Sequence, residues 1–377
     1  MKTHQIYLDN AAATPMDPKV LEAMLPYFTE KYGNPEALHT KGKESLIAID
    51  NARETVSKIL NCRAREIIFC GTATEANNLA IFGTARANKE KGNHLITTKI
   101  EHSSVRRPFE QLEKEGFDVT YLDVDKEGFV NPDDIKKALT PKTTLVSVMY
   151  ANNEIGTIEP IKEIGEILCD HKAYFHTDAC QIPGAETLDT SILKVDMMTL
   201  NGSKIYGPKG IGVLYVNKET KIEPIIFGST HEYSLRAGTH NTPLIVGFAC
   251  ALELTTNTTN KKITKLRDKL ISSLLEKIPQ SHLNGPTDRR LPNNINITIP
   301  GIHAQEILLH LDEAGIYVST GAACNMGNEK PSKTLEAIGL PKKEILSSLR
   351  ITLGKNTTEG DINYVIKTLP EIYFRTI

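Results

Sequence analysis

The sequence lacks tryptophan, and its six cysteines show no CxxC spacing. Scattered cysteines favour neither a structural metal site nor a disulfide framework. The chain also lacks a run of about 18 apolar residues, which argues against a membrane span. Its formal net charge of −2 gives no electrostatic reason to bind nucleic acid or an anionic membrane. No apolar leader precedes Ile6-Tyr7-Leu8, so we expect a protein of the reducing cytoplasm.

Short apolar runs alternate with amphipathic stretches over much of the 377 residues. Strands are expected at residues 67–70, 95–98, 119–122, 144–150, 173–177, 195–200 and 211–216. Helices are expected from Pro18 and at residues 74–86, 105–116, 132–139 and 161–170. This order predicts an α/β fold with a mostly parallel sheet and helices on both faces. Ligands of such sheets bind at the carboxyl ends of the strands.

The pattern changes near residue 251, where a segment rich in Thr, Asn and Lys begins. The elements expected there are helices at 252–275, 304–313 and 361–372, and strands at 294–299 and 315–319. We therefore predict a large domain of residues 14–255. Residues 256–377, together with residues 1–13, are predicted to form a smaller α+β domain.

Lys204 follows the strand expected at 195–200 and stands among small residues before the turn Gly207-Pro208. A lysine held in this way can present its amine in a cleft and bind the aldehyde of a carbonyl cofactor covalently. An isolated lysine is more often exposed and ordinary. The assignment therefore depends on what the other strand ends carry.

Four other strand ends carry polar residues. Thr74, in Gly71-Thr72-Ala73-Thr74-Glu75, can add a hydroxyl to an anion cup at a helix N-terminus, or it can be a plain helix cap. His102 can face a ligand or be a buried core histidine. Asn153 lies in a segment that can also be an asparagine-rich turn. Asp178 would be costly to bury unless it faces a cation or donor.

These five strand ends supply an anion cup, an imidazole, amide donors, a carboxylate and an amine. Pyridoxal phosphate needs the same groups: a cup for its phosphate, a stacking face for its ring, a carboxylate for its pyridinium nitrogen and a lysine for its aldehyde. Each feature alone is weak evidence. Together they favour this cofactor.

The chain resembles the cysteine desulfurases typified by the nitrogenase-associated and iron–sulfur-cluster housekeeping enzymes. These belong to class V of the fold-type I pyridoxal phosphate proteins. The resemblance covers nearly the whole length. Its motifs are Tyr7-Leu8-Asp9-Asn10-Ala11-Ala12-Ala13-Thr14-Pro15, Tyr32-Gly33-Asn34-Pro35, Ala73-Thr74-Glu75, Glu101-His102, Asn152-Asn153-Glu154-Ile155-Gly156, Asp178-Ala179-Cys180-Gln181, Lys204-Ile205-Tyr206-Gly207-Pro208-Lys209-Gly210, Arg236-Ala237-Gly238-Thr239, Gly321-Ala322-Ala323-Cys324 and Arg350-Ile351-Thr352-Leu353-Gly354.

The resemblance implies pyridoxal 5′-phosphate as cofactor and a role for each matched residue. Lys204 would bind the cofactor and move the substrate α-proton, and His102 would stack on the ring and relay protons. The other cofactor contacts would come from Ala73 and Thr74 (phosphate), Asp178 (pyridinium nitrogen) and Gln181 (ring oxygen). Asn153 would contact the cofactor or the substrate near that oxygen. Arg350 would clamp the substrate carboxylate, a task suited to guanidinium, with help from Asn34. Thr239 would reach the phosphate of a neighbouring subunit, which implies a homodimer.

Cys324 stands among small and polar residues after an expected strand. This composition favours an exposed loop in which a thiol can become reactive, although most single cysteines are buried and structural. That ordinary interpretation is applied to Cys62, Cys169 and Cys250, and Cys70 and Cys180 are interpreted as small packing residues. The resemblance implies that Cys324 takes sulfur from L-cysteine as a persulfide, releases alanine and passes the sulfur on. The segment up to Pro331 is as long as in the group whose loop delivers sulfur directly to partners.

Four departures from the family pattern stand out. Asn201-Gly202-Ser203 replaces the usual Ser-Gly-His or Ser-Ala-His before the lysine, although Asn201 and Ser203 can still donate to a phosphate. Residues 228–234 are bulkier than the usual glycine-rich loop. Glu36-Ala37 replaces two serines. The chain stops at Ile377, without the longer tail that docks a cluster scaffold in the housekeeping enzymes.

Several alternatives remain at this level. A selenocysteine lyase or another class V aminotransferase would share the cofactor residues, but an aminotransferase does not need Cys324. A non-catalytic protein would not need Lys204, Asp178, Arg350 and Cys324 together. The sulfur acceptor is expected to be an iron–sulfur scaffold, a tRNA-thiolation enzyme or a sulfur carrier protein, because acceptor docking is a surface property that the motifs do not specify.

Overall fold

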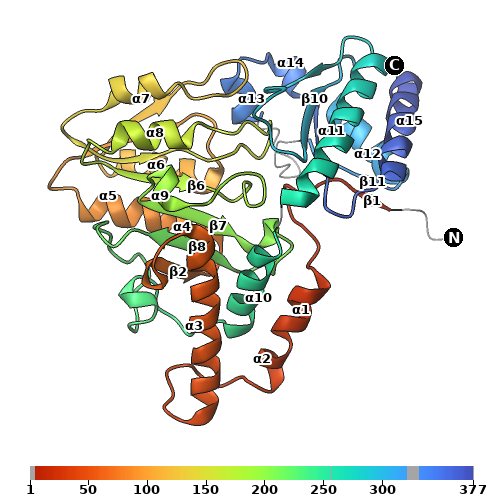
Figure 1. Ribbon diagram of the computed structural model, residues 1–377. Coiled ribbons are helices and arrows are strands. Elements are labelled where there is room, and N and C mark those ends of the chain that lie inside the picture. Colours follow the sequence, from red (N-terminus) through yellow and green to blue (C-terminus); the bar gives the residue numbers. More distant parts are fainter. Residues whose placement is uncertain (1–4, 256, 321–330, 377) are drawn as a thin grey trace.

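The computed structural model describes residues 5–255, 257–320 and 331–376 (Figure 1). A seven-stranded sheet forms the centre of the larger part, in the order β2-β8-β7-β6-β5-β3-β4. Its strands are β2 (Ile67–Cys70), β3 (His94–Thr98), β4 (Asp118–Leu122), β5 (Thr143–Ser147), β6 (Tyr174–Asp178), β7 (Met197–Asn201) and β8 (Gly212–Val216). The pairs from β4 to β7 are parallel, and β8 pairs antiparallel with both β7 and β2. The predicted mostly parallel sheet is confirmed.

Neighbouring residues of the central strands enter two different apolar cores. In β3, Leu95 belongs to one core and Ile96 to the other, and β5 divides Leu145 and Val146 in the same way. This follows from the two-residue period of a strand, which points successive side chains to opposite faces. A sheet buried on both faces needs helices on both sides, as predicted.

The helices cover these two faces (Figure 1). One core takes side chains from α1 (Pro18–Met24), α3 (Thr40–Leu60), α8 (Ile161–Leu168) and α10 (Thr242–Glu253). The other takes side chains from the π-turn Leu79–Gly83, α5 (Thr84–Ala87) and α6 (Ser103–Lys114). The remaining helices of this part are α2 (Pro26–Thr29), α4 (Ala73–Asn78), α7 (Pro132–Ala138) and α9 (Thr190–Leu193).

The rest of the molecule is built around a smaller antiparallel sheet with the strand order β12-β10-β9. Its strands are β9 (His282–Leu283), β10 (Asn294–Thr298) and β12 (Ser348–Thr352). Its elements also include α11 (Asn257–Lys277), α12 (Ala304–Glu313), α13 (Lys333–Ala337), α14 (Lys342–Ile345) and α15 (Glu359–Thr376). Near the N-terminus, β1 (Ile6–Tyr7) pairs in parallel with β11 (Ile316–Tyr317), and Ile6 and Leu8 enter the apolar core of this part. The domain boundary at residue 255 stays a prediction.

Some elements differ from the expectations. The single helix expected at 74–86 is α4 and α5 with a π-turn between them. The helices α3 and α10 and the strand β12 had no predicted counterpart. In α3 the buried face includes the small residues Gly42, Ser45, Ala48 and Ala52, which weaken the hydrophobic period that marks a helix in a sequence.

The cysteines follow the predictions only in part. Cys70 and Cys180 are buried, as expected of packing residues. The prediction of a buried residue is wrong for Cys169, which is exposed because it follows the last turn of α8, and Cys62 and Cys250 are only partly buried. Over the described ranges, the molecule has no helix long and apolar enough to cross a membrane.

Candidate active site

A cavity of about 700 Å³ lies at the carboxyl ends of the central strands and extends to β12 of the smaller sheet. Nine of the residues predicted for the site line it: Ala73, Thr74, His102, Asn153, Asp178, Gln181, Asn201, Lys204 and Arg350. They come from segments far apart in the sequence. The volume is that of a site for a cofactor-sized ligand.

Lys204 ends a short turn, Gly202–Lys204, that directly follows β7. Its Nζ donates a hydrogen bond to the carbonyl oxygen of Ala12. The same turn is fixed by Thr14, whose backbone N–H and hydroxyl both donate to the Ser203 carbonyl, at 2.9 and 3.0 Å. Burial lowers the pKa of Lys204, because the charged ammonium loses its hydration; the nearby Cys180 opposes this shift. Burial therefore shifts Lys204 toward the neutral amine, the form that reacts with a carbonyl group.

Asp178 is the last residue of β6 and is 6% exposed. Its Oδ2 accepts a hydrogen bond from Asn77 Nδ2 at 2.8 Å, and its Oδ1 accepts one from the Cys180 N–H at 3.0 Å. These donors stabilise the charged carboxylate inside the molecule. A buried carboxylate in a ligand cavity can hold a protonated ring nitrogen.

His102 caps the N-terminus of α6. Its Nδ1 accepts the backbone N–H of Ser104 at 3.1 Å and lies 2.7 Å from the Ser104 hydroxyl, which also accepts a hydrogen bond from Asn77. Burial lowers the pKa of His102, which favours the neutral ring. Because Nδ1 accepts the Ser104 N–H, the neutral ring carries its proton on Nε2. Ser104 and Asn77 connect this imidazole to Asp178. The sequence interpretation missed both of these residues, and their only signal is that they lie on the helices that follow two of the motifs.

The expected phosphate end is built around the start of α4. The capping alternative falls on Thr72, whose hydroxyl accepts the Glu75 N–H at 3.1 Å. Thr74 is therefore not the cap, and it lines the cavity. Asn201 also lines the cavity, and its Oδ1 accepts both the N–H and the hydroxyl of Ser203 at 3.0 Å. Ser203 is thus hydrogen-bonded to Asn201 and is not one of the residues that line the cavity.

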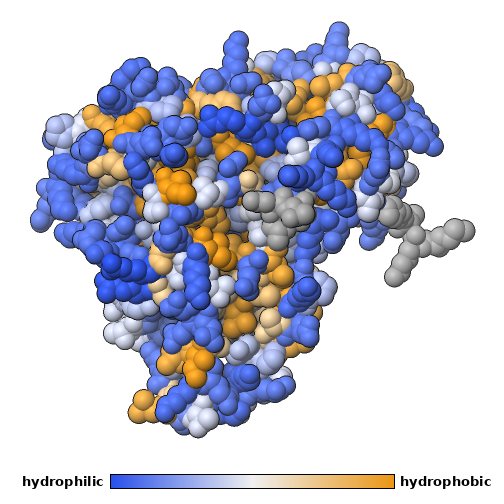
Figure 2. All heavy atoms as spheres, viewed as in Figure 1, coloured by the Kyte–Doolittle hydropathy of each residue, from blue (hydrophilic) through white to orange (hydrophobic). Residues whose placement is uncertain are grey.

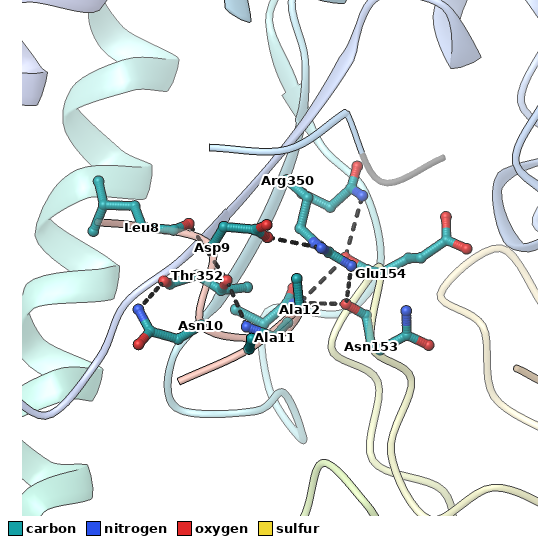
Figure 3. A network of polar contacts seen from close by, with 12 residues as sticks. Leu8, Asp9, Asn10, Ala11, Ala12, Asn153, Glu154, Arg350 and Thr352 are labelled. Atoms are coloured by element: carbon teal, nitrogen blue, oxygen red, sulfur yellow. Dashed lines mark hydrogen bonds and ion pairs between the residues drawn. The ribbon is translucent and has the colours of Figure 1, made fainter. Parts of the chain in front are cut away.

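Arg350 lies on β12, is 6% exposed and points between two other segments of the chain (Figure 3). Its Nη2 donates to Asp9 Oδ1 at 2.8 Å and its Nη1 to the Asn153 carbonyl at 3.3 Å. Its Nε is buried without a hydrogen-bond partner in the part of the chain that the structure describes. No role was predicted for Asp9, although the sequence marks it as a carboxylate directly after the apolar run Ile6-Tyr7-Leu8.

Gln181 connects the cavity to the N-terminal segment, because its Nε2 donates to the Ala11 carbonyl at 3.1 Å. Asn34 and Thr239 are not brought to the cavity. They lie together in a separate hollow of about 340 Å³ on the surface, with Tyr32 and His240 among its other lining residues. Cys324 lies outside the described residues.

The loop at 228–234 has three consecutive residues with positive φ: Glu232 (45°), Tyr233 (57°) and Ser234 (67°). This backbone is costly for side chains other than glycine. The loop is fastened by Glu232, which forms a buried two-bond ion pair with Arg53, with its nearer contact at 2.6 Å, and accepts the Phe69 N–H at 2.8 Å. The bulkier loop is thus held by a buried charge pair.

Residues 6–365 match the class V aminotransferase family. The fold and the cavity agree with this match, and the chain belongs to that family, whose members use pyridoxal 5′-phosphate. Within it the chain belongs to the cysteine desulfurases. It is 49% identical over 373 residues to the cysteine desulfurase IscS of Clostridium botulinum, covering 98% of this chain and 94% of that protein. The cysteine desulfurase IscS of Dictyoglomus turgidum is 47% identical over 371 residues, with the same coverage of 98% and 94%.

Solved structures are similar over nearly the whole chain. A NifS-like protein superimposes with a TM-score of 0.93 at 34% identity, covering 99% of this chain and 100% of that one. A structure described as SspA in complex with cysteine gives a TM-score of 0.84 at 36% identity, covering 94% and 100%. The predicted fold-type I architecture is confirmed.

The residues of the cavity fit pyridoxal 5′-phosphate. Burial lowers the pKa of both Lys204 and His102, and the carboxylate of Asp178 is buried and hydrogen-bonded. An amine of lowered pKa, a buried carboxylate and a flat imidazole ring suit an aldehyde, a pyridinium and an aromatic face.

Proposed function

We propose that the protein converts L-cysteine to L-alanine and keeps the sulfur as a persulfide on Cys324. The observation that carries this proposal is one cavity holding a lysine of lowered pKa, a buried carboxylate and a buried arginine, namely Lys204, Asp178 and Arg350. Bound pyridoxal phosphate supplies an electron sink for the bond changes at the substrate. All other tasks fall to the chain.

Lys204 would hold the cofactor through Nζ and would take and return the α-proton of the substrate. Burial lowers the pKa of Lys204, which suits a lysine that accepts a proton as the neutral amine. Asp178 would pair with the ring nitrogen, and His102 would face the ring. Gln181 and Asn153 would bind near the ring oxygen. Ala73, Thr74 and Asn201 would hold the phosphate, with Ser203 supporting Asn201.

Arg350 binds the carboxylate of the substrate. Its Nε is buried without a partner among the described residues, and its Nη2 is held by Asp9. A planar guanidinium offers two parallel donors, which suits a carboxylate. This contact selects an amino acid over an amine.

Cys324 receives the sulfur. A bond forms between its thiolate sulfur and the sulfur of the substrate, and the carbon–sulfur bond of the substrate breaks. The electron pair of that bond stays on the substrate carbon, which takes up a proton and becomes the methyl group of alanine. The balance is L-cysteine plus the Cys324 thiol giving L-alanine plus the Cys324 persulfide.

The active unit is proposed to be a homodimer in which Asn34 and Thr239 serve the cavity of the neighbouring subunit. Two observations support this arrangement. The two residues lie together at the surface, outside the cavity of their own subunit. Large apolar side chains are exposed on the same part of the chain, namely Leu25 (54%) between α1 and α2, Phe28 (54%) on α2 and Ile47 (59%) on α3. Figure 2 shows orange side chains over the lower part of the molecule. Exposed apolar patches of this kind mark interaction surfaces.

The persulfide is proposed to be passed on in the cytoplasm to an iron–sulfur scaffold, which the IscS name of the relatives supports. A tRNA-thiolation enzyme or a carrier protein would accept the same sulfur. We further propose that residues 14–255 form the cofactor domain and that residues 256–377 with 1–13 form the small domain, which is supported by its separate apolar core.

The test is alanine release from L-cysteine and from L-selenocysteine by the purified protein with reductant and pyridoxal phosphate. The proposal predicts alanine and sulfide from cysteine. Alanine from selenocysteine alone would identify a lyase for that amino acid. Transfer of the amino group to a 2-oxo acid would identify an aminotransferase.

A further inference from the structure

Glu154 fastens the start of α13. Its carboxylate accepts a hydrogen bond from the hydroxyl of Ser332 and one from the hydroxyl of Thr334 at 3.4 Å. Both hydroxyl residues are buried, at 4% and 3% exposure. Ser332 also caps α13 by accepting the Leu335 N–H at 3.1 Å. Removing the carboxylate would leave both buried hydroxyls without this acceptor.

The backbone of Glu154 is fixed to the smaller sheet. Its carbonyl accepts the side-chain amides of Asn294 and Asn296, both at 3.2 Å. Asn296 stands directly opposite Arg350 in the pairing of β10 with β12. Glu154 is therefore bonded through its backbone carbonyl to β10, the strand that pairs with the one carrying Arg350, and through its carboxylate to the start of α13.

Arg350 is hydrogen-bonded to Ser319, a residue of a different segment from Ser332 and Thr334. Its backbone exchanges two hydrogen bonds with Ser319, at 2.7 and 3.1 Å. Its Nη1 donates to the carbonyl of Asn153, the residue before Glu154. Ser319 precedes Cys324 in the chain and Ser332 follows it. Ser319 is thus bonded to Arg350, and Ser332 is bonded to Glu154. Arg350 and Glu154 are in turn connected through Asn153.

We propose that Glu154 is a positioning residue for sulfur transfer: by holding Ser332 and Thr334 it fixes the place of α13 relative to Arg350, and the loss of this connection slows the transfer of sulfur to Cys324. This inference rests on the proposed function. It requires no contact between Glu154 and the cofactor, so it predicts a loss in the sulfur step alone. A contact that only stabilised the fold would affect every property of the enzyme equally.

The test measures the rate of persulfide formation on Cys324 by rapid quenching, alkylation and mass spectrometry of the full-length holoenzyme. The variants are Glu154→Ala, Ser332→Ala and the double substitution. Glu336→Ala is the matched control, since Glu336 lies on α13 but pairs with the exposed Lys333. Cofactor absorbance and its change on adding L-cysteine report binding separately from sulfur transfer.

The proposal predicts that either single variant slows persulfide formation by about tenfold to a hundredfold, because small misplacements of reacting groups have effects of this size. The double variant is then no slower than the slower single variant, since both break one connection. Cofactor retention and the cysteine-dependent absorbance change stay at the wild-type level.

Three results would overturn it: an unchanged rate in Glu154→Ala, rate losses that multiply in the double variant, or a parallel loss of cofactor. Failure of the proposed function is distinguishable, because the wild-type protein itself would then carry no persulfide on Cys324.

Discussion

Arg350 Nη2 and Asp9 Oδ1 lie 2.8 Å apart, although 341 residues separate them in the chain. The pair joins the N-terminal segment to strand β12 of the smaller sheet. Arg350 stays buried where it lines the cavity. Asp9 compensates the guanidinium charge when no anionic ligand is near. A substrate carboxylate then meets an arginine that is already oriented.

Replacing Arg350 by Ala is expected to raise the KM for L-cysteine by about tenfold to a hundredfold, because a charged hydrogen bond contributes about 1.5–3 kcal/mol. Arg350→Lys should not restore binding, since an ammonium lacks the two parallel donors. Cofactor absorbance should not change. Steady-state kinetics checks this, with Arg86→Ala as a control, because Arg86 forms a surface pair with Glu115. An unchanged KM would remove Arg350 from substrate binding.

Lys204 is expected to be the only covalent attachment point of the cofactor. Borohydride reduction of the holoenzyme should fix pyridoxal phosphate to the peptide that contains Lys204, and Lys204→Ala should give no labelled peptide. Lys209→Ala, a change at a nearby exposed lysine, should label normally. Peptide mapping decides the point, and a label on another lysine would contradict the assignment.

Asn201→Ala is expected to weaken cofactor retention, because Asn201 lines the cavity and also fixes Ser203 in the turn before Lys204. The expected loss is about 1–3 kcal/mol, as for a buried group left without its hydrogen-bond partner. Equilibrium titration of the apoprotein with pyridoxal phosphate measures it. If the affinity of the variant equals that of the wild type, the phosphate is held by other residues.

Glu159 is expected to make stability depend on pH. It is 2% exposed, its Oε2 accepts the Val130 N–H at 2.9 Å, and burial raises its pKa from 4.5 to about 8. The folded state therefore binds this proton more tightly than the unfolded state, so its contribution is fully present below pH 4.5 and falls as the pH rises to about 8. The slope is at most about 1.4 kcal/mol per pH unit in that window.

Urea unfolding at pH 6 and pH 8.5 tests this dependence. Glu159→Gln should lose less stability between the two pH values than the wild type does, whereas Glu163→Gln, at an exposed position of α8, should behave like the wild type. Equal pH dependence in all three proteins would show that Glu159 does not carry the effect.

Strand ends were the most predictable part of the site. Lys204, Asp178 and His102 each follow an apolar run, so their meeting at one edge of a parallel sheet could be inferred from the alternation of elements. Asn77 and Ser104 could not, because they support Asp178 and His102 from helix positions that no periodic pattern marks.

Long-range partners were the least predictable part. Asp9 and Arg350 are 341 positions apart in the chain, and Glu154 and Ser332 are 178 positions apart. No local pattern in the sequence marks either contact. In the same way α3 was missed, because small residues on its buried face replace the large apolar ones that reveal a helix. Separation in the sequence and small-residue packing both hide contacts from pattern analysis.

The most direct test of the central claim is the mass of the peptide that contains Cys324 after one turnover with L-cysteine, together with the alanine released. The account predicts one added sulfur atom on Cys324 for each alanine formed. It also predicts that Cys324→Ser keeps the cofactor absorbance and forms no protein persulfide. Alanine release at the wild-type rate without added sulfur on Cys324, or by Cys324→Ser, would contradict it.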